Sequence, residues 1–316
     1  MIENPKLNEL FQRCLNYPDP DTRERLARLI GLDDHKAKLS KILGLLVNPN
    51  GLKAWAEKNH PGADSIVMSV LRRPPLVVLA GDVGSGKTEL AETIGDAVAR
   101  QEDIDITLFP LSLSTRGQGR VGEMTQLLSA AFDRTAEEAR KLKAHDERSR
   151  GAVILLVDEA DALAQSREAA QMHHEDRAGV NAFIRGVDRI ANERLPAAVI
   201  MCTNRLSALD PAVQRRATCI LRFERPNDEQ RHRVLAPLLK ELNFTDKQVK
   251  DMVASTGARN GQAYGFTFSD LTQRLVPEIV LDAYPERAIS ASRALEIAKR
   301  MIPTPPFRED TNEKTI

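Results

Sequence analysis

The chain has little cysteine, few aromatic residues and no net charge. Its 316 residues include three isolated cysteines, Cys14, Cys202 and Cys219, and no C-x-x-C pair, so we expect neither a disulfide framework nor a zinc site. Aromatic residues make up 4% of the chain, and 45 basic side chains balance 45 acidic ones. This balance argues against a general electrostatic grip on nucleic acid or anionic lipid, although it leaves room for a local basic patch.

Long hydrophobic runs are missing as well. The longest, such as Ala152–Val157, are far too short to span a bilayer, and the polar start Met1–Asn4 does not resemble a signal peptide. We therefore expect a soluble, cytoplasmic globular protein with no membrane partner. At roughly 100–200 residues per domain, the length allows one large domain or two modest ones.

Short apolar segments do occur, and they alternate with longer helical ones. Such segments, continuous in apolar residues and of strand length, are typical of strands buried on both faces of a sheet. We expect strands at 76–80, 104–110, 152–157, 197–201 and 219–223. Helical stretches lie between them at 87–100, 124–143 and 177–191. This alternation predicts an α/β fold, a parallel sheet with helices on both faces.

The segments before the first strand are predicted to be mostly helical. Residues 1–28 carry no strong strand signal and are interpreted as a short helical lead-in. Residues 29–46 have apolar positions at mostly helical spacing behind a cap at Asp33 or Asp34. Residues 48–62 are rich in Asn, Pro and Gly, so we expect a loop broken by a short helix.

The strand signals end at Pro226. Residues 227–302 are predicted to form a small all-helical domain, interrupted at 257–265, and the α/β domain is predicted to span 29–226. The tail at 303–316 is polar and proline-rich, so we expect it to be disordered.

The strongest motif is the stretch Gly81–Thr88, which fits G-x-x-x-x-G-K-[ST] and lies directly between a predicted strand and a helix. Its glycines allow backbone N–H groups to surround phosphates at a helix N-terminus. Lys87 is expected to reach the β- and γ-phosphates, and the Thr88 hydroxyl to ligate magnesium. A glycine-rich turn without a ligand is the alternative, which the strand–motif–helix context disfavours. The nucleotide-contacting candidates are Gly81, Asp82, Val83, Gly84, Ser85, Gly86, Lys87, Thr88 and Glu89.

Two carboxylates, Asp158 and Glu159, end the third apolar run. Carboxylates at the end of a buried strand are costly unless an ion or substrate uses them. Asp158 is expected to hold Mg²⁺, directly or through water, and Glu159 to orient and polarise the attacking water. Alone the pair is a moderate signal, because acidic residues are common where strands meet loops. Together with the preceding phosphate-binding loop (P-loop) at Gly81–Thr88, it becomes strong.

Polar residues also follow the fourth apolar run and the short helix after it. Asn204 ends the fourth run, where it could hydrogen-bond the γ-phosphate and the lytic water, or equally serve as a turn former or helix cap. Arg215 and Arg216 follow a short helix that starts at Pro211. Paired arginines are usually solvated, but no other motif supplies an arginine to stabilise the transition state. A neighbouring subunit could supply it, which implies a ring.

In this order, and followed by a helical lid, these motifs resemble those of AAA+ ATPases. The match starts at Leu29–Leu32, where Ile30 and Gly31 look like the start of the family's adenine pocket. It extends to Gly265–Leu271, similar to a lid motif in which one position often carries a nucleotide-sensing arginine. Ser269 occupies that position, so a lid arginine is either absent or displaced. The resemblance covers about residues 29–301 and implies an AAA+ P-loop ATPase that uses ATP and Mg²⁺.

Within that superfamily, residues 176–190 and 210–217 are most similar to the pachytene checkpoint protein 2, or thyroid-receptor-interacting-protein, ATPases that remodel HORMA domains. By this likeness Arg216 matches the trans-acting arginine finger, and Arg215 falls where relatives carry another residue. Because the ATPase module starts near residue 29, the chain resembles compact bacterial forms encoded beside HORMA proteins and cGAS-like nucleotidyltransferases in CBASS anti-phage systems. The resemblance implies a homohexamer that disassembles the HORMA complex and holds the nucleotidyltransferase in check.

AAA unfoldases carry an aromatic–hydrophobic–glycine loop on the central pore, and the matching positions here are Arg120, Val121, Gly122 and Glu123. Arginine replaces the aromatic residue; a guanidinium can pack against a peptide backbone or pair with acidic residues. An ordinary charged surface loop is the alternative. Residues 165–176, which include His173 and His174, are interpreted as a second pore-facing loop rather than as a metal site.

Three other functions compete with HORMA remodelling. A nucleic-acid motor or loader of the same superfamily needs a basic groove and aromatic platforms, and the neutral charge and few aromatics weigh against it. A general protein unfoldase is the second. A non-catalytic nucleotide-binding scaffold is the third, and intact Lys87, Glu159 and Arg216 argue against it.

Overall fold

The computed structural model describes residues 10–11, 13–113, 122–143, 149–163, 173–259 and 261–307. These residues divide into two compact units. The first, here called the sheet unit, is drawn from Met1–Ala27, Asp34–Ala80 and Thr88–Arg222. The second, the helical unit, is drawn from Arg28–Asp33, Gly81–Lys87 and Phe223–Ile316. The P-loop thus groups with the C-terminal helices.

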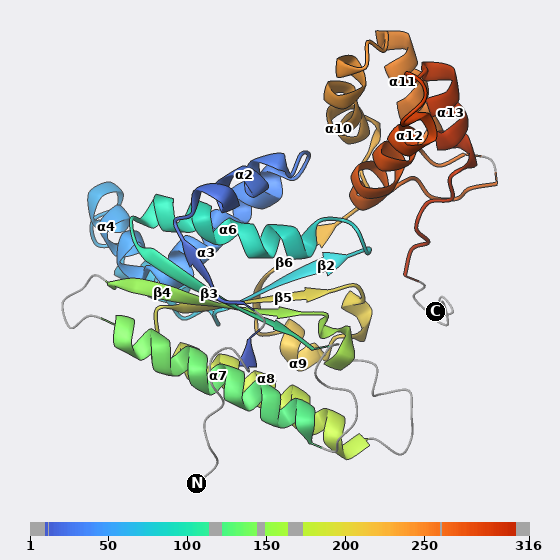
Figure 1. Ribbon diagram of the computed structural model, residues 1–316. Helices are drawn as coiled ribbons and strands as arrows, with labels where there is room; N and C mark the ends of the chain where they lie inside the picture. Colours follow the sequence, from blue (N-terminus) through green and yellow to red (C-terminus); the bar gives the residue numbers. More distant parts are fainter. Residues whose placement is uncertain are drawn as a thin grey trace, which may run out of the picture. The chain divides into compact units, whose positions relative to one another are not determined.

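The sheet has six strands in the order β1-β3-β4-β5-β2-β6 (Figure 1). The pairs β2–β5, β3–β4 and β4–β5 are parallel, and β1–β3 is antiparallel. Residues 152–157 of β4 and all of β5 are buried, because helices cover both faces, which explains their continuous apolar sequences. The strands are β1 (Leu15–Tyr17), β2 (Leu76–Gly81), β3 (Asp105–Ser112), β4 (Gly151–Asp158), β5 (Ala197–Thr203) and β6 (Ala217–Phe223). The predicted α/β sheet is confirmed, with an antiparallel edge strand added.

Helices flank the sheet on both sides (Figure 1). One face carries α2 (Pro20–Arg28), α3 (Asp33–Val47), α4 (Pro49–Asn59) and α6 (Lys87–Glu102). The other carries α7 (Glu123–Leu142), α8 (His173–Asn192) and α9 (Pro211–Gln214). Among the described residues, none of the helices combines the length and the apolar character that crossing a membrane requires.

The core beneath the sheet depends on a close approach of α7 and α8. The rings of Phe132 on α7 and Phe183 on α8 are both buried and meet edge to face, with centroids 5.4 Å apart. Gly186, also on α8, lies directly against Phe132: a Cβ at this glycine would be 2.2 Å from the ring. The lack of a side chain at Gly186 therefore sets how closely the two helices pack.

Replacing Gly186 with alanine should destabilise the sheet unit by about 1–3 kcal/mol, because the new methyl group must displace a buried ring. Gly179→Ala is the matched control on the same helix, since a Cβ there would meet Met124 and Leu163 at 3.5 and 3.6 Å, an ordinary contact distance. It should be neutral or slightly stabilising. Urea unfolding of both variants tests this, and equal midpoints would show that the Phe132 contact does not limit the packing.

The N-terminal segment departs from the predicted lead-in. The helix α2 is present, but β1 precedes it and pairs with the edge of β3, with Tyr17 opposite Ile106. Tyr17 is held by tertiary contacts: its hydroxyl donates to the Glu92 carbonyl, and its ring occupies the space where a Cβ of Gly95 would lie. Burial raises the pKa of Tyr17 above its ordinary range. The strand β1 was not predicted because its three residues are too few to show an alternation of apolar and polar side chains. Residues 1–9 and 12 lie outside the described part.

Two segments that were predicted as loops are partly or wholly helical. Residues 48–62 were predicted as mostly loop, yet they form α4 and lead through Gly62, at φ +86°, into α5 (Asp64–Leu71). Pro49 starts α4, where a missing N–H costs nothing, so it marks a helix start rather than a break. The helix α8 begins at His173, four residues before the predicted start at Arg177. The remainder of the predicted second pore loop, 165–172, lies outside the described residues.

The helical unit confirms the helices predicted after Pro226. Leu235, Val249, Phe266, Leu271 and Ile297 are among the buried residues of its own core. Capping boxes at Asn227 and Thr245 begin the first two helices. Its elements are α10 (Asp228–Glu241), α11 (Asp246–Ser255), the π-helical η4 (Asp270–Leu275), α12 (Val276–Ala283) and α13 (Ala291–Arg300).

The start of the C-terminal tail is bound to this unit. Thr304 donates its backbone N–H and its hydroxyl to the two carboxylate oxygens of Asp270, at 3.0 and 2.7 Å. Burial acts to raise the pKa of Asp270, but hydrogen bonds from Thr267, Thr304 and Arg274 outweigh it and hold the pKa below its ordinary value. Residues 308–316 of the predicted tail lie outside the described part.

Candidate nucleotide-binding site

Three glycines of the P-loop have positive φ angles: Gly81 at +155°, Gly84 at +74° and Gly86 at +92°. Glycine tolerates such angles, and successive backbone N–H groups in this kind of turn form a concave site for anions. The loop also leaves no room for side chains, because a Cβ on Gly81 would lie 2.1 Å from the Phe223 carbonyl oxygen. The helix α6 starts at Lys87, so its N-terminal end follows directly. The loop therefore fits the phosphates of a nucleotide.

Lys87 spans this loop. Its ammonium donates to the carbonyl oxygens of Gly81 and Asp82, both at 2.8 Å, and the residue is 6% exposed. A buried lysine whose donors already face the P-loop is placed for phosphate oxygens to replace the carbonyls. The structure thus places the Lys87 ammonium at the P-loop, where the motif predicts it.

Asp82 anchors the loop within the helical unit. Its carboxylate accepts from Arg225 Nε at 2.7 Å and from the backbone N–H of Phe307 at 3.3 Å. Arg225 in turn donates to the Gly265 carbonyl at 2.7 Å and stacks over the Tyr264 ring. Sequence reasoning did not find Arg225, which lies 143 positions from its partner.

The predicted lid and adenine-pocket residues belong to the same unit as the P-loop. The backbone N–H of Ser269 donates to the Gly84 carbonyl at 3.1 Å, while its hydroxyl donates to Gln273. The Gly31 carbonyl accepts from Gln230 at 2.8 Å, and Ile30 packs against the helical core. The structure therefore brings Ser269 to the P-loop through its backbone.

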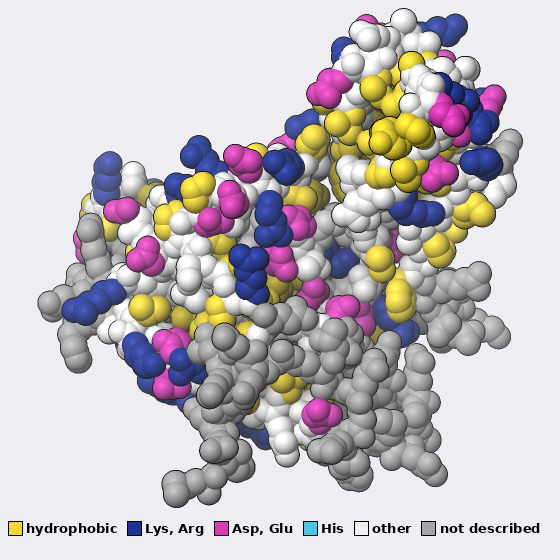
Figure 2. Space-filling view, viewed as in Figure 1, with side chains coloured by type: hydrophobic (Ala, Val, Ile, Leu, Met, Phe, Trp, Pro, Cys, Tyr) yellow, Lys and Arg dark blue, Asp and Glu magenta, His cyan; other side chains and the backbone are white. Residues whose placement is uncertain are grey.

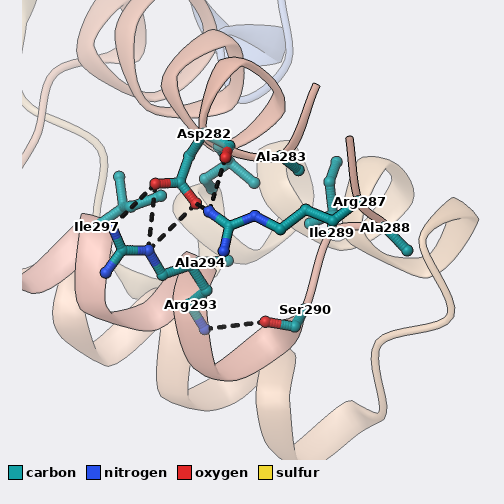
Figure 3. A pocket seen from close by; sticks show the side chains of 10 residues that line it. Asp282, Ala283, Arg287, Ala288, Ile289, Ser290, Arg293, Ala294 and Ile297 are labelled. Carbon is teal, nitrogen blue, oxygen red and sulfur yellow. Dashed lines mark hydrogen bonds and ion pairs between the residues drawn. The ribbon is translucent and has the colours of Figure 1, made fainter. Parts of the chain in front are cut away.

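The helical unit also contains a small pocket between α12 and α13 (Figure 3). Asp282 accepts hydrogen bonds from both Arg287, at 2.6 Å, and Arg293, at 3.0 Å. Arg293, together with Arg287, holds the pKa of Asp282 below its ordinary value. Because these charged groups pair with one another, we interpret the cluster as a structural link between α12 and α13 rather than as a charged ligand site.

In the sheet unit, the carboxyl ends of neighbouring parallel strands meet at one edge. Val157 of β4 pairs with Met201 of β5, and Thr203 of β5 pairs with Ala80 of β2. Because β2 lies beside β5 although it precedes β3 and β4 in the chain, the strand order reverses here. Ligands of open α/β sheets bind at such reversals, outside the carboxyl ends of the strands.

Asp158 ends β4, and Glu159 follows it at this edge. Glu159 is exposed and has φ +55°, a left-handed conformation that costs a non-glycine residue about 1–2 kcal/mol. Its carboxylate accepts from the Ser112 hydroxyl at 2.6 Å, and its N–H donates to Asp158 at 2.8 Å. Strained backbone clusters at functional sites, so this conformation favours a role for Glu159 beyond packing. Ser112, at the end of β3, was not found from the sequence.

Asn204 follows β5 and contacts Asp161. Its amide nitrogen donates to the Asp161 carboxylate at 2.9 Å, and its backbone N–H donates there too. It caps no helix in the described part of this region, where Arg205 precedes the short helix η3 (Leu206–Ala208). The structure therefore disfavours the helix-cap interpretation of Asn204.

Arg216 forms a bidentate ion pair within its own chain. Its Nε and Nη2 atoms donate to Asp188 of α8 at 2.7 and 2.9 Å, which raises the pKa of Arg216. The pair is partly exposed, with side-chain exposures of 31% for Arg216 and 40% for Asp188. Arg215, its neighbour, is exposed. The guanidinium of Arg216 is thus held at the protein surface in a fixed orientation.

Three further predicted positions are placed as follows. The carboxylate of Glu89, a predicted nucleotide contact, accepts a hydrogen bond from Arg25 of α2 at 2.9 Å. Gly122 directly precedes α7 at φ +81°, and Glu123, predicted in a loop, is the first residue of that helix. Arg120 and Val121 lie outside the described residues.

Comparison with known proteins places this site in a family. Residues 77–227 match the model of the ATPase family associated with various cellular activities (AAA). Over 307 residues the chain is 69% identical to CD-NTase-associated protein 6 of Escherichia coli (strain MS 115-1), covering 97% of this chain and 99% of that protein.

Solved structures agree with this match. A chain of the E. coli MS115-1 HORMA:CdnC:Trip13 complex is 68% identical with a TM-score of 0.89, over 96% of this chain and 100% of that one. Rhizobiales Trip13 is 57% identical with a TM-score of 0.73, over 94% of this chain and 100% of that one. The P-loop geometry and these matches together show that the chain belongs to the AAA family of nucleotide-binding ATPases, in the group of CD-NTase-associated protein 6.

Proposed function

We propose that the chain forms a hexameric ring that uses ATP hydrolysis to pull apart a complex between a HORMA-domain protein and a cGAS-like nucleotidyltransferase. By separating them it would hold the nucleotidyltransferase in check in anti-phage defence. The similarity over almost the whole chain to a component of a HORMA:CdnC:Trip13 complex carries this proposal. The cytoplasmic location remains a prediction from the sequence.

For nucleotide binding, we assign the phosphates to the P-loop amides and Lys87, and the adenine to the segment around Ile30 and Gly31. Thr88 and Asp158 would supply the oxygen ligands for Mg²⁺, which in nucleotide sites is usually held by one or two protein oxygens, phosphates and water. Bound magnesium would neutralise charge that develops on the phosphates. Residues 29–226 would act as the ATPase body and 227–302 as its lid.

For hydrolysis, we assign Glu159 to polarise the attacking water, because its carboxylate is exposed yet held in place by Ser112. Asn204 would contact that water. Arg216 would reach the γ-phosphate bound by the neighbouring protomer. Its guanidinium remains partly exposed where it pairs with Asp188 of α8, so it is accessible to a nucleotide outside its own chain.

For mechanical work, we assign the segment Arg120–Glu123 to the ring's pore. Gly122 at φ +81° and the start of α7 at Glu123 give that segment a fixed base. Arg120 would bind the substrate peptide through its guanidinium. Nucleotide-driven movement of the ATPase body would move this segment along the pore axis.

The test is release of the nucleotidyltransferase from a pre-formed complex with its HORMA partner, followed by size-exclusion chromatography. With catalytic amounts of the chain and ATP, we expect the two proteins to elute separately. With Glu159→Gln and ATP, the complex should stay intact and co-elute with the ring. A complex that survives continued ATP hydrolysis by the wild-type chain would show that the substrate is a different one.

The nucleic-acid alternative predicts a continuous basic surface. On the face that Figure 2 draws, Lys and Arg side chains of the described residues are interleaved with Asp and Glu, which supports a protein substrate.

A further inference from the structure

Asp161 is a buried carboxylate to which the functions above assign no role. It lies in the short helix η1 (Ala160–Leu163), directly after the Asp158–Glu159 pair, and is 7% exposed. A buried carboxylate is costly unless hydrogen bonds replace its water. Asp161 therefore has to be explained by the groups that bind it.

Its donors all come from one place, the end of β5. Oδ1 accepts from the Thr203 hydroxyl at 2.7 Å and from the backbone N–H of Arg205 at 2.9 Å. Oδ2 accepts from the backbone N–H of Asn204 at 3.0 Å and from its side-chain nitrogen at 2.9 Å. One side chain following β4 thus binds the whole turn that follows β5.

This arrangement determines which way the Asn204 amide faces. An ionised carboxylate only accepts hydrogen bonds, so the amide nitrogen of Asn204 has to face Asp161. The carbonyl oxygen of that amide, Oδ1, is then turned away from the carboxylate. An isolated asparagine could present either end of its amide to a ligand, whereas this one presents a fixed acceptor.

We propose that Asp161 is a positioning residue for ATP hydrolysis: it fixes the Asn204 amide so that Oδ1 accepts a hydrogen from the attacking water. This inference rests on the proposed contact between Asn204 and the attacking water. A water molecule that donates one hydrogen to Asn204 and the other to Glu159 is held in one orientation by these two acceptors. Its oxygen lone pair can then point toward the phosphorus atom that it attacks. Asp161 therefore connects the residues after β4 with those after β5 in one reactive geometry.

Replacing Asp161 with asparagine should lower kcat about 10–100-fold, since misplacing a positioning group by about 1 Å has effects of this size. KM for ATP and the affinity for a fluorescent ATP analogue should stay within about threefold, because Asp161 has no part in ground-state binding. Thr203→Val is the matched control: it removes the hydroxyl that donates to the same carboxylate and accepts from the Arg205 N–H at 3.1 Å, and it leaves the Asn204 contact with Asp161 in place. It should keep kcat within about threefold of wild type.

A double-mutant cycle separates positioning from general support. If Asp161 acts through Asn204, then Asp161→Asn should cause no further loss of kcat in the Asn204→Ala background. Losses that multiply in the double variant would overturn the inference. If Asn204→Ala itself turns over like wild type, the proposed function fails at that residue, and this result is distinct from a normal kcat in Asp161→Asn alone.

Should Asp161→Asn fail to fold in a thermal melt, Asp161→Glu replaces it. That variant keeps the charge but moves the carboxylate by one methylene, so kcat should again fall while KM stays unchanged. Unfolding of both variants, or normal kcat in a folded one, would overturn the inference by assigning Asp161 a structural role.

Discussion

The Glu159→Gln variant should bind ATP like the wild type but hydrolyse it about 10²–10⁴-fold more slowly, the usual contribution of a general base. Glutamine has nearly the same shape, and its carbonyl oxygen can still accept the hydrogen bond that Ser112 donates to Glu159. What is lost is the ability to polarise or deprotonate water. Phosphate release measured at saturating ATP, together with binding of a fluorescent ATP analogue, gives both quantities.

Ser112→Ala is the control for this variant. It keeps the carboxylate of Glu159 and removes the hydroxyl that binds it at 2.6 Å, so it should lower kcat by about tenfold or less. A Glu159→Gln variant with normal turnover would assign the base to another residue.

The second large effect is expected at Arg216. Arg216→Ala should lower ATP hydrolysis about 10³–10⁵-fold, the range found for arginine fingers, and leave ATP binding intact. The ion pair that it removes is partly exposed and contributes about 0–1 kcal/mol, so the fold should persist. Steady-state hydrolysis and a thermal melt measure the two effects.

Arg215→Ala is the matched control for this substitution, because Arg215 is adjacent, exposed and of the same charge. We expect it to retain hydrolysis within a fewfold. The swapped variant, Arg216→Asp with Asp188→Arg, separates folding from chemistry further. It can rebuild the ion pair and the stability, yet it should remain inactive. Activity in the swapped variant would mean that Arg216 serves only to join α9 to α8.

The central strands could be predicted because helices cover them on both faces, which makes β2, β4 and β5 continuously apolar. The edge strand β1 could not. It has three residues, and its position depends on Tyr17 packing against Gly95 and Glu92 far along the chain. The helix α4 could not be predicted for a different reason, since a proline such as Pro49 suits the first turn of a helix as well as a loop.

The residues of the candidate site also differ in how far they could be predicted from the sequence. Lys87, Asp158 and Glu159 lie in contiguous motifs, where backbone geometry and chemistry restrict each position, so their spacing was readable. The residues that hold them in place are not contiguous with them: Ser112 binds Glu159 from 47 positions away, and Asp161 binds Asn204 from 43. No local pattern carries such pairings, because they arise only when the strands align. Glu89 shows the converse, since adjacency to the motif placed it near the nucleotide while its carboxylate binds Arg25.

The most direct test of the whole account is a subunit-mixing experiment with two inactive variants. Arg216→Ala protomers keep Glu159 but lack the finger, and Glu159→Gln protomers lack the base but can donate Arg216 to a neighbour. If hydrolysis is completed across a protomer boundary, exchange of the two in equal amounts should restore activity at about a quarter of the sites of a randomly mixed ring. A mixture that stays as inactive as its components, although the rings demonstrably exchange subunits, would contradict the account.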